Sequence, residues 1–507
     1  MCGIIAYAGP ESAVPILVSG LRTLEYRGYD SAGIGVQNGS SKISVTRALG
    51  VDQLAEAVSQ NGSGCVSVPN VGIAHTRWAT HGGVTVPNAH PHTSADGRVA
   101  IVHNGIVENY MELRAELSDA GIEFTSETDS EVIAHLVARC IDSGDSLAAA
   151  VRCTAQRIRG ASSFVATSAD EPGVIVGVRL GNAGGIVVGV GDGFNLLASD
   201  VLAILPHTDG IIYLQSGEVA TIQPSGAEIS DLSGETLDRP VVKTGRSFEA
   251  AAKGEHRHFM AKEIAEQPEA VSSAMRRRVD FDGGTINLQE VPFTDEQIRS
   301  IDRVVVSGMG TSLHSCMYGA QMIEALAGIP AQAENASELR YRQTALNDRT
   351  LVISVTQSGE TADTLAAMEM SAESGSRQLA LVEAEGTQAT LVANGTLYLG
   401  AGQEIGVAST KTMMCSLAVL YQLAVYLGER RGSLSAAQVS DFVSDLSRLP
   451  GLIAEMIDDG GNAERLARER LVNKQHLMYL GRGALHPMAM EGALKMKELA
   501  YLHAEGY

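Results

Sequence analysis

Short apolar runs separated by glycine-rich turns make up most of the chain from its start to about Ile222. Their length and their β-branched residues predict strands of layered sheets. Helical patterns interrupt them at 107–120 and 130–141, and Thr128 with Glu131 predicts a capping box at the start of the second helix. Residues 2–224 are therefore expected to form an α+β sandwich. The clearest strand-like runs are Gly72 to Ala74, Val99 to Val102, Val174 to Val178, Gly185 to Val190 and Ile211 to Leu214.

The pattern changes after residue 224. Residues 225–293 are richer in charge and predict a connecting segment, whose run Arg276-Arg277-Arg278 is expected to be solvated surface. From 294 to 433, strands alternate with helices, which predicts a parallel, doubly wound α/β sheet. A second unit of this type begins within 467–507, with a single strand and helix, from His476 and Met488. The strands predicted for the first unit are Arg303 to Ser307, Leu351 to Val355, Gln378 to Val382 and Thr396 to Leu399.

Composition and charge narrow the class of protein. The 507 residues, 45% hydrophobic and 19% charged, are enough for two or three folded domains. A net charge of -21 argues against binding to nucleic acid or to an anionic membrane, because both are negatively charged themselves. The most membrane-like stretch, Ser416 to Gly428, is too short for a bilayer and predicts a buried helix. The six cysteines have no CxxC spacing and no secretory segment is found, so we expect reduced thiols and a cytoplasmic protein.

Cys2 directly follows the initiator methionine, so removal of Met1 makes it the first residue of the mature chain. Its thiol then lies beside a free α-amine, whose pKa of about 7.7 to 8.0 lets it accept the thiol proton near neutral pH. One residue can thus supply both nucleophile and base. A small buried residue without chemistry is the alternative for a cysteine at this position.

Three other segments fit the needs of such a nucleophile. Asn104 and Gly105 offer a side-chain amide and a flexible backbone N–H for a developing oxyanion. Arg77 can bind the carboxylate of a free amino acid, and Asp129 can pair with its ammonium group. The alternatives are stacking of Arg77 on Trp78 at the surface, and a purely structural role for Asp129 at a helix N-terminus.

His90 and His92 have the spacing of a metal-binding pair on a strand. We find no third ligand with convincing spacing, and we therefore expect no metal site. His90 is expected to organise the pocket around the nucleophile, and His92 to be structural.

The order of the motifs favours function over each alternative. Cys2 to Ile4, Glu25 to Gly33, His75 to Gly82, Asn88 to His92, His103 to Gly105 and Glu127 to Glu131 occur in turn. Together these segments resemble the class II glutamine amidotransferases. The resemblance implies a four-layer N-terminal-nucleophile sandwich, in which Cys2 forms a glutamyl thioester and releases ammonia, with Asn104 and Gly105 as the oxyanion hole. It assigns the binding of glutamine to Arg77, Trp78, Thr80, His81, His90 and Asp129.

Two hydroxyl-rich loops in the second half each follow a predicted strand and open a helix, at Ser307 to Ser312 and Thr356 to Thr364. Backbone N–H groups and hydroxyls at helix N-termini can hold a phosphate dianion. The loops lack the third glycine of the dinucleotide motif and the G-K-[ST] of a nucleotide-binding loop, so we expect no nucleotide cofactor. Simple capping of the helices by serine and threonine is the alternative.

With Glu404 to Lys411, these loops resemble the sugar isomerase (SIS) domains, which bind phosphosugars. The resemblance assigns the sugar phosphate to Thr311, Ser312, Thr356, Gln357, Ser358, Thr361, Val407 and Ser409.

Farther along the chain, Glu491, Lys495 and Glu498 fall on one face of a predicted helix. Salt bridges along the helix would explain this spacing. The resemblance instead makes them catalytic, with Glu498 moving the proton between C1 and C2 of the sugar.

An amidotransferase half followed by SIS units resembles the aminotransferases that move the amide nitrogen of L-glutamine to D-fructose 6-phosphate. The products are D-glucosamine 6-phosphate and L-glutamate. The resemblance implies channelled ammonia with Trp78 as a gate, no cofactor, and a homodimer. Family members continue beyond the segment equivalent to His503 to Tyr507 into a stretch that holds a ring-opening histidine and an imine-forming lysine, so we expect the second SIS domain to be incomplete. A glutaminase alone and a phosphosugar-binding regulator remain as alternatives.

Overall fold

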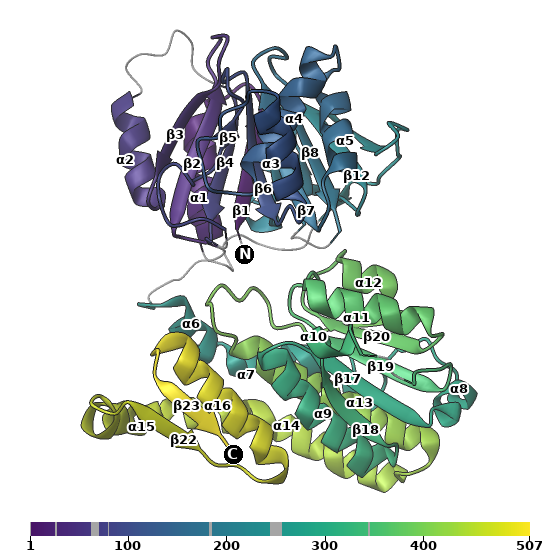
Figure 1. The fold of residues 1–507 in the computed structure, drawn as a ribbon. Coiled ribbons are helices and arrows are strands. Elements are labelled where there is room, and N and C mark those ends of the chain that lie inside the picture. The colour runs from purple at the N-terminus through teal and green to yellow at the C-terminus, as the bar shows by residue number, and fades with distance from the viewer. Residues whose placement is uncertain are drawn as a thin grey trace. The chain divides into compact units, whose positions relative to one another are not determined.

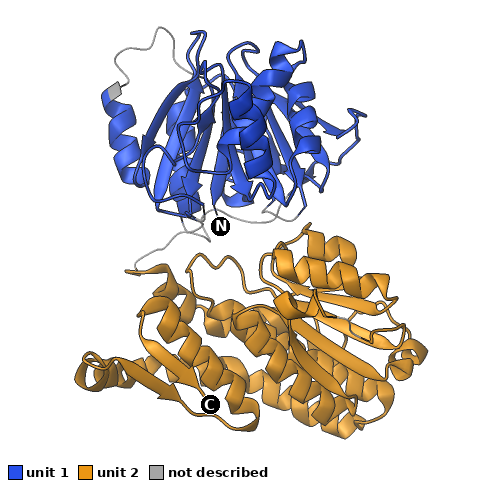
Figure 2. Ribbon diagram, in the orientation of Figure 1, with its two compact units in different colours: residues 1–249 blue, residues 250–507 orange. Residues whose placement is uncertain are grey.

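The computed structural model describes residues 2–25, 28–61, 70–79, 81–181, 185–243, 256–342 and 345–507. The chain forms two compact units, unit 1 with residues 1–249 and unit 2 with residues 250–507 (Figure 2). Each unit has its own hydrophobic core.

Unit 1 is built on two antiparallel sheets (Figure 1). In spatial order, the first sheet consists of β14 (Val242–Lys243), β11 (Gly210–Tyr213), β9 (Val187–Val190), β10 (Asn195–Ala198), β1 (Gly3–Ala8), β4 (Val71–Arg77), β2 (Ser31–Gln37) and β3 (Ser44–Ala48). The second consists of β13 (Gly226–Asp231), β12 (Glu218–Gln223), β8 (Ile175–Leu180), β7 (Ser162–Ser168), β6 (Val99–Gly105) and β5 (His92–Thr93).

The alternation of side chains along β1 shows how the layers of unit 1 are stacked. Ile4 and Ala6 pack into the core between the two sheets, whereas Ile5 and Tyr7 pack against helices on the other face. Both faces of the strand are buried, which explains its continuous apolar sequence. Helices α1 (Ala13–Leu24) and α2 (Val51–Asn61) cover the first sheet, and α3 (Tyr110–Asp119), α4 (Glu131–Asp142) and α5 (Leu147–Arg157) cover the second. The predicted α+β sandwich is confirmed.

The capping box predicted at the start of α4 is wrong. The helix begins at Glu131, and its N-cap residue makes no side-chain capping bond. The Glu131 carboxylate instead accepts hydrogen bonds from the backbone N–H groups of Thr125 and Ser126, at 2.8 and 2.7 Å. The hydroxyl of Thr128 lies 3.0 Å from Nε2 of His92. Contacts across the fold thus replaced the local bonds that the motif predicts.

Unit 2 contains a five-stranded sheet in which every strand pair is parallel. Its order is β18 (Ala331–Asn335), β17 (Arg303–Gly308), β19 (Thr350–Val355), β20 (Arg377–Val382) and β21 (Gly395–Tyr398). Four of these strands were predicted, and β18 was not. The sequence of β18, Ala-Gln-Ala-Glu-Asn, lacks an apolar run because β18 is an edge strand that is only partly buried.

Helices lie on both faces of this sheet, as expected for a doubly wound fold (Figure 1). Val304 and Val306 of β17 face one core, and Val305 faces the other. The larger core lies against α7 (Gln267–Met275), α8 (Asp295–Ser300), α9 (Thr311–Ala327), α13 (Lys411–Arg431) and α14 (Ala436–Asp458). The opposite face is covered by α10 (Ala336–Leu339), α11 (Ala362–Glu373) and α12 (Gln388–Val392).

Helix α13 is long and apolar enough to cross a membrane by length and composition, and it is the one such helix among the described residues. Most of it is buried against α7 and α9 inside unit 2. The predicted buried helix at Ser416 to Gly428 is therefore confirmed.

The C-terminal part of unit 2 contains the strand and the helix predicted for 467–507. They are β22 (His476–Tyr479) and α16 (His486–Leu499), and β23 (His503–Gly506) pairs with β22 in parallel. A helical stretch precedes them, with α15 (Gly460–Leu466) and a π-helix at Ala467–Leu471.

The described parts of segment 225–293 are integrated into the two units. Strands β13 and β14 join the sheets of unit 1, while α6 (Phe259–Ala265), α7 and the hairpin β15 (Val279–Asp280) with β16 (Thr285–Ile286) belong to unit 2.

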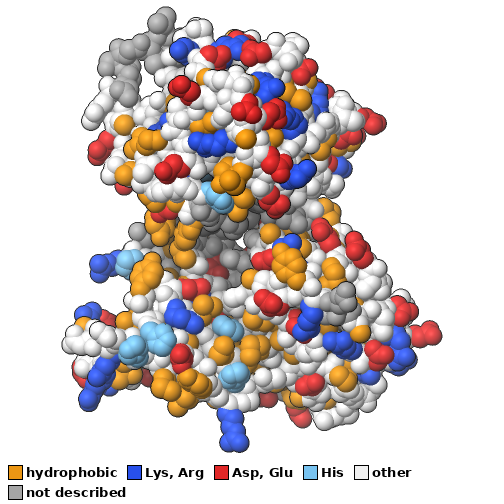
Figure 3. All heavy atoms as spheres, viewed as in Figure 1, with side chains coloured by type: hydrophobic (Ala, Val, Ile, Leu, Met, Phe, Trp, Pro, Cys, Tyr) orange, Lys and Arg blue, Asp and Glu red, His pale blue; other side chains and the backbone are white. Residues whose placement is uncertain are grey.

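The expectation that the whole run 276–278 is solvated is wrong, because Arg278 is only 6% exposed. Its guanidinium pairs with Glu290 at 2.9 Å and donates to the carbonyl oxygen of Tyr398 at 2.7 Å. On the face drawn in Figure 3, basic and acidic side chains are interspersed.

Candidate active sites

Cys2 immediately precedes β1, and β4 is one of the two neighbours of β1 in the sheet. Its Sγ accepts a hydrogen bond from the backbone N–H of Trp78, which follows β4, at 3.2 Å. The Sγ also lies 3.6 Å from the Trp78 carbonyl oxygen, to which the thiol can donate. A backbone N–H directed at sulfur favours the thiolate form. Trp78 thus contacts the sulfur through its backbone, while the residue as a whole is 40% exposed and its ring packs edge-on against Tyr29.

Asn104 and Gly105 lie at the end of β6, close to Cys2. The Asn104 side-chain amide donates to the carbonyl oxygen of Cys2 at 3.1 Å. Its Oδ1 lies 3.0 Å from Nε2 of His75, which must therefore carry the proton of this bond. His75 fixes the orientation of the amide, so that its N–H groups point toward the nucleophile. Gly105 has φ of 127°, a conformation that favours glycine, and its exposed backbone is open to a ligand.

Four buried histidines lie beside this pair. The rings of His75 and His90 stack with 4.2 Å between centroids, and those of His90 and His92 meet edge to face at 4.5 Å. Nδ1 of His90 accepts from the backbone N–H of His103 at 3.2 Å. His90 thus contacts the backbone of His103, the residue that precedes Asn104. Burial lowers the pKa of His75 and His92 to about 3, that of His103 to about 4, and that of His90 well below its usual value.

These depressed pKa values predict that unit 1 loses stability as the pH falls from 6.5 to 5. The folded state keeps the four histidines neutral, whereas the unfolded chain protonates them near pH 6.5, so the unfolded state binds more protons. Each histidine then lowers the free energy of unfolding by about 1.4 kcal/mol per pH unit below 6.5. Urea unfolding followed by tryptophan fluorescence measures unit 1 alone, because Trp78 is the one tryptophan of the chain.

His92→Gln is the matched variant for this prediction. Glutamine can keep a hydrogen bond to Thr128 but cannot be protonated, so the slope of stability against pH should fall by about one proton. Equal slopes for the variant and the parent between pH 6.5 and 5 would contradict the assignment. Carboxylates contribute little in this window, because their ordinary pKa values lie near 4.

The charged residues expected to hold glutamine are both buried, at 4% exposure each. Arg77, whose pKa is lowered by burial, donates to the carbonyl oxygens of His81, Gly82 and Gly83. Asp129 accepts from the backbone N–H of Val107 at 2.8 Å. Arg77 thus orders the loop that follows β4, including the backbone of His81, whose ring packs edge-on against Tyr110. Thr80 lies outside the described residues.

In unit 2, the N-terminus of α9 meets the side chains predicted on α16. Thr311 Oγ1 donates to Glu491 at 2.9 Å and accepts from Lys495 Nζ at 2.9 Å. Lys495 also pairs with Glu491 at 3.1 Å and with Glu498 at 2.8 Å. The three residues of α16 therefore share one face, as predicted, and that face is joined to the first hydroxyl-rich loop.

His314 is a further member of this cluster, and no motif in the sequence indicated its role. Its Nδ1 lies 2.6 Å from a carboxylate oxygen of Glu491. Burial opposes ionisation of Glu491, but hydrogen bonds from His314 and Thr311 and the charge of Lys495 hold the pKa of Glu491 below its ordinary value. A charged carboxylate beside a lysine and a histidine can take part in proton transfer.

The second hydroxyl-rich loop follows β19, the strand next to β17. Thr356 Oγ1 and Thr361 Oγ1 are 3.2 Å apart, and Ser358 Oγ accepts from the backbone N–H of Glu360 at 3.2 Å. Because carboxyl ends of neighbouring parallel strands meet at one edge of the sheet, this loop and the loop with Ser312 lie at the same edge. Gln357 links the second loop to a third segment, since its Nε2 lies 3.4 Å from Glu404.

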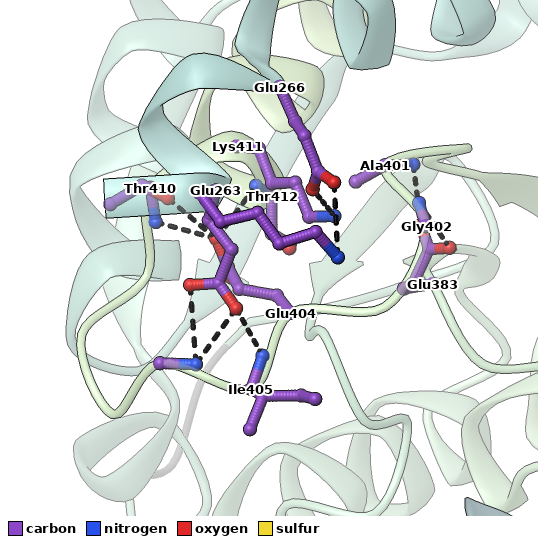
Figure 4. A network of polar contacts seen from close by, with 12 residues as sticks. Glu263, Glu266, Glu383, Ala401, Gly402, Glu404, Ile405, Thr410, Lys411 and Thr412 are labelled. Carbon is purple, nitrogen blue, oxygen red and sulfur yellow. Dashed lines mark hydrogen bonds and ion pairs between the residues drawn. The ribbon is translucent and has the colours of Figure 1, made fainter. Parts of the chain in front are cut away.

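Segment 401–412, which carries Val407 and Ser409, is held by acidic side chains (Figure 4). Glu404 accepts from the backbone N–H of Thr410 at 2.7 Å and from Ser409 Oγ at 2.9 Å. Glu263 of α6 accepts from the backbone N–H groups of Ile405 and Gly406. Glu383, which follows β20, binds the N–H groups of Ala401 and Gly402 in the same way. Val407 itself is 68% exposed.

Glu263 and Glu383 were missed in the sequence. Glu263 is 2% exposed, and burial raises its pKa, so its two backbone donors provide the compensation that a buried carboxylate needs. Glu266, which lies one helical turn after Glu263, pairs with Lys411 at 2.7 Å. For Glu263, the only signal in the sequence was the charged character of segment 225–293, which was predicted to be a connection.

Comparison with known families agrees with this division into two sites. Residues 53–153 match the glutamine amidotransferase domain family, and residues 297–426 match the SIS domain family. A solved structure described as the C-terminal domain of glucosamine-fructose-6-phosphate aminotransferase from Francisella tularensis is 33% identical, with a TM-score of 0.48. The match covers 50% of this chain and 71% of the chain in that structure.

Two curated relatives are similar over the whole chain. The glutamine–fructose-6-phosphate aminotransferase (isomerizing) of Streptomyces coelicolor is 42% identical over 507 residues, which is 100% of this chain and 81% of the relative. The enzyme of the same name from Thermus thermophilus is 41% identical, with 100% and 82% covered. Because it is this similar to these enzymes over its full length, the chain belongs to the family of isomerizing glutamine–fructose-6-phosphate aminotransferases.

Proposed function

We propose that this protein transfers the amide nitrogen of L-glutamine to D-fructose 6-phosphate, with D-glucosamine 6-phosphate and L-glutamate as products. The observation that carries the proposal is the similarity over the full chain to enzymes of this name. The chemistry of the two sites fits both half-reactions. Unit 1 has a thiol beside a side-chain amide, and unit 2 has hydroxyl-rich loops beside a lysine and two carboxylates.

In unit 1, Cys2 attacks the side-chain amide carbon of glutamine after Met1 has been removed. The α-amine takes the thiol proton, and the backbone N–H of Trp78 stabilises the thiolate. Asn104 Nδ2 and the N–H of Gly105 donate to the oxyanion, with the Asn104 amide oriented by His75. As this tetrahedral intermediate collapses, the α-ammonium group of Cys2 returns its proton to the leaving nitrogen, the C–N bond breaks, and ammonia and a glutamyl thioester form. Water then hydrolyses the thioester to glutamate and the free thiol.

Glutamine is held by the remaining residues of this pocket. Arg77 binds the α-carboxylate, Asp129 pairs with the α-ammonium group, and Thr80 and His81 also bind the substrate. Trp78 gates the passage of ammonia. Transfer without release is required because ammonia in bulk water near neutral pH becomes ammonium, which is not a nucleophile.

In unit 2, the phosphate of fructose 6-phosphate binds to hydroxyl and N–H groups of the two loops, with Val407 and Ser409 beside the sugar. The positive end of α9 adds a favourable field for the dianion. The loop residues are Thr311, Ser312, Thr356, Gln357, Ser358 and Thr361. The cluster of Glu491, Lys495 and Glu498 then serves the isomerisation, in which Glu498 carries the proton between C1 and C2.

The organisation that goes with this function has residues 2–224 as the amidotransferase domain and 294–433 as the first SIS domain. Residues 467–507 contribute to a second SIS domain. We propose a homodimer, which light scattering on the purified protein tests directly.

The test is a product assay on purified protein with glutamine and fructose 6-phosphate. We expect glutamate and glucosamine 6-phosphate in equal amounts. Glutamate without the amino sugar would identify a glutaminase. Binding of fructose 6-phosphate without any Cys2-dependent release of glutamate would identify a phosphosugar-binding regulator.

A further inference from the structure

Two cysteines that are far from Cys2 in the sequence lie side by side in unit 1. Cys140 is in the last turns of α4, and Cys153 is in α5, which packs against α4. Their Sγ atoms are 2.9 Å apart, and the thiol of Cys140 donates to the sulfur of Cys153. Both side chains are partly exposed, whereas Cys316 and Cys415 are fully buried. Neither Cys140 nor Cys153 has a role in the proposed reaction.

The distance between the two sulfur atoms distinguishes a metal site from a pair that can form a disulfide. Asp145, in the turn between the helices, lies within 4.8 Å of both sulfurs and completes a set of three possible metal ligands. Two thiolates on a tetrahedral zinc ion, each about 2.3 Å from the metal, would be about 3.8 Å apart. The sulfurs here are much closer than that, and they need to approach by less than about 1 Å to reach the length of a disulfide.

The charge of the surroundings is compatible with a disulfide at this pair. Burial, the neighbouring Cys153 and the carboxylate of Asp145 raise the pKa of Cys140 to about 12. A disulfide carries no charge, so these surroundings do not oppose its formation.

We propose that Cys140 and Cys153 are a modification site at which a hydroperoxide links α4 to α5 through a disulfide. Cys153, as the thiolate, attacks one oxygen of hydrogen peroxide, the O–O bond breaks, and a sulfenic acid and water form after one proton is taken up. The sulfur of Cys140 then attacks the sulfenic sulfur. The S–O bond breaks, and the hydroxide leaves as water with the proton of Cys140. In sum, two thiols and one peroxide give one disulfide and two waters.

Trypsin provides a direct test, because it cleaves after Arg139, Arg152 and Arg157. Cys140 and Cys153 then lie on adjacent peptides, 140–152 and 153–157, which stay joined only if the disulfide has formed. The full chain with Cys2→Ala is reduced, freed of reductant, treated with hydrogen peroxide, alkylated and digested. We expect the joined pair as the main oxidised product, and its loss on treatment with dithiothreitol.

Matched variants make the result specific. Cys140→Ser or Cys153→Ser should abolish the joined peptides and leave a sulfenic or higher oxidised acid on the remaining thiol, whereas Cys316→Ser should not change them. Oxidation of both cysteines to separate acids in the parent would overturn the proposal. The proposal would also be overturned if peroxide failed to join the peptides and the reduced protein bound cadmium tightly. Such binding would be seen as a thiolate charge-transfer absorption that depends on Asp145.

The disulfide should also stabilise unit 1, because it closes a short loop of the unfolded chain. Thermal unfolding followed by Trp78 fluorescence should show a Tm higher by about 5 °C after oxidation. The shift should be absent from Cys140→Ser treated in the same way. An unchanged Tm in a sample with fully joined peptides would contradict a close fit of the disulfide to the native helix pair.

Discussion

Replacement of Cys2 by alanine is expected to lower the release of glutamate from glutamine by at least about 10³-fold. Alanine removes the sulfur that accepts the N–H of Trp78 and forms the thioester. The pocket around it is held by contacts that do not involve the sulfur, such as the bond between His75 and Asn104. Binding of glutamine should therefore survive, so that the loss is in kcat. Steady-state glutaminase kinetics and calorimetric titration with glutamine measure the two effects separately.

Cys153→Ser is the matched control, because it changes another partly exposed cysteine of the same unit. It should keep the parent kcat. Mass spectrometry adds an independent readout, since a glutamine analogue with an electrophilic group should label the demethionylated parent at Cys2 and leave Cys2→Ala unlabelled. Glutamate release by Cys2→Ala within tenfold of the parent would remove the basis of the proposed mechanism.

A lesser loss is expected for Asn104→Ala, of about 10²- to 10³-fold in kcat, because one oxyanion donor is lost while the nucleophile remains. His75→Ala should also lower kcat, but by less, because His75 orients the Asn104 amide through a hydrogen bond.

Glu404→Gln is expected to weaken the binding of fructose 6-phosphate by about 10- to 100-fold. The Glu404 carboxylate ties Ser409 and Thr410 to Gln357, and so connects the segment with Val407 to the second hydroxyl-rich loop. Glutamine keeps the size of the side chain but loses the charge that strengthens these bonds. Glu263→Gln should act in the same direction, because the Glu263 carboxylate binds the N–H groups of Ile405 and Gly406. Calorimetric titration with fructose 6-phosphate measures both effects.

Two controls distinguish loss of the ordered segment from general damage. Glu269→Gln changes a glutamate of α7 outside these contacts and should leave the affinity unchanged. The glutaminase rate of each variant without sugar should equal that of the parent, because Cys2 is in the other unit. Hydrogen exchange should be faster at segment 401–412 in Glu404→Gln. Unchanged affinity in both Glu404→Gln and Glu263→Gln would refute the role of these carboxylates in holding the sugar site.

The prediction of the fold from sequence was successful where one physical signal dominated. The apolar runs of β17, β19 and β20 are buried on both faces, so their periodicity was unambiguous. The signal failed at β18, which is an edge strand with polar residues. It also failed at Arg278, because a buried guanidinium with well-placed acceptors cannot be distinguished in sequence from a solvated one. The capping box of α4 failed for a related reason, since Glu131 found stronger partners in the preceding loop.

The same distinction between local and long-range signals applies to the residues of the candidate sites. Cys2, Asn104 and the residues of α16 were found because their chemistry and spacing are local properties of the sequence. His75, His314 and Glu263 were missed as positioning residues, because each acts on a partner that is distant in the sequence. His75 lies 29 residues from Asn104, and His314 lies 177 residues from Glu491. Only the fold determines such pairs.

By itself, the sequence determined the two fold classes, the order of the units and the chemical groups at each site, because apolar periodicity and residue type are written along the chain. The tertiary structure decided which buried polar groups satisfy one another. Hydrogen bonding to a buried histidine or carboxylate depends on distance and direction in space, and a linear pattern holds neither. For the same reason, only the folded helix pair revealed that Cys140 and Cys153 lie in contact.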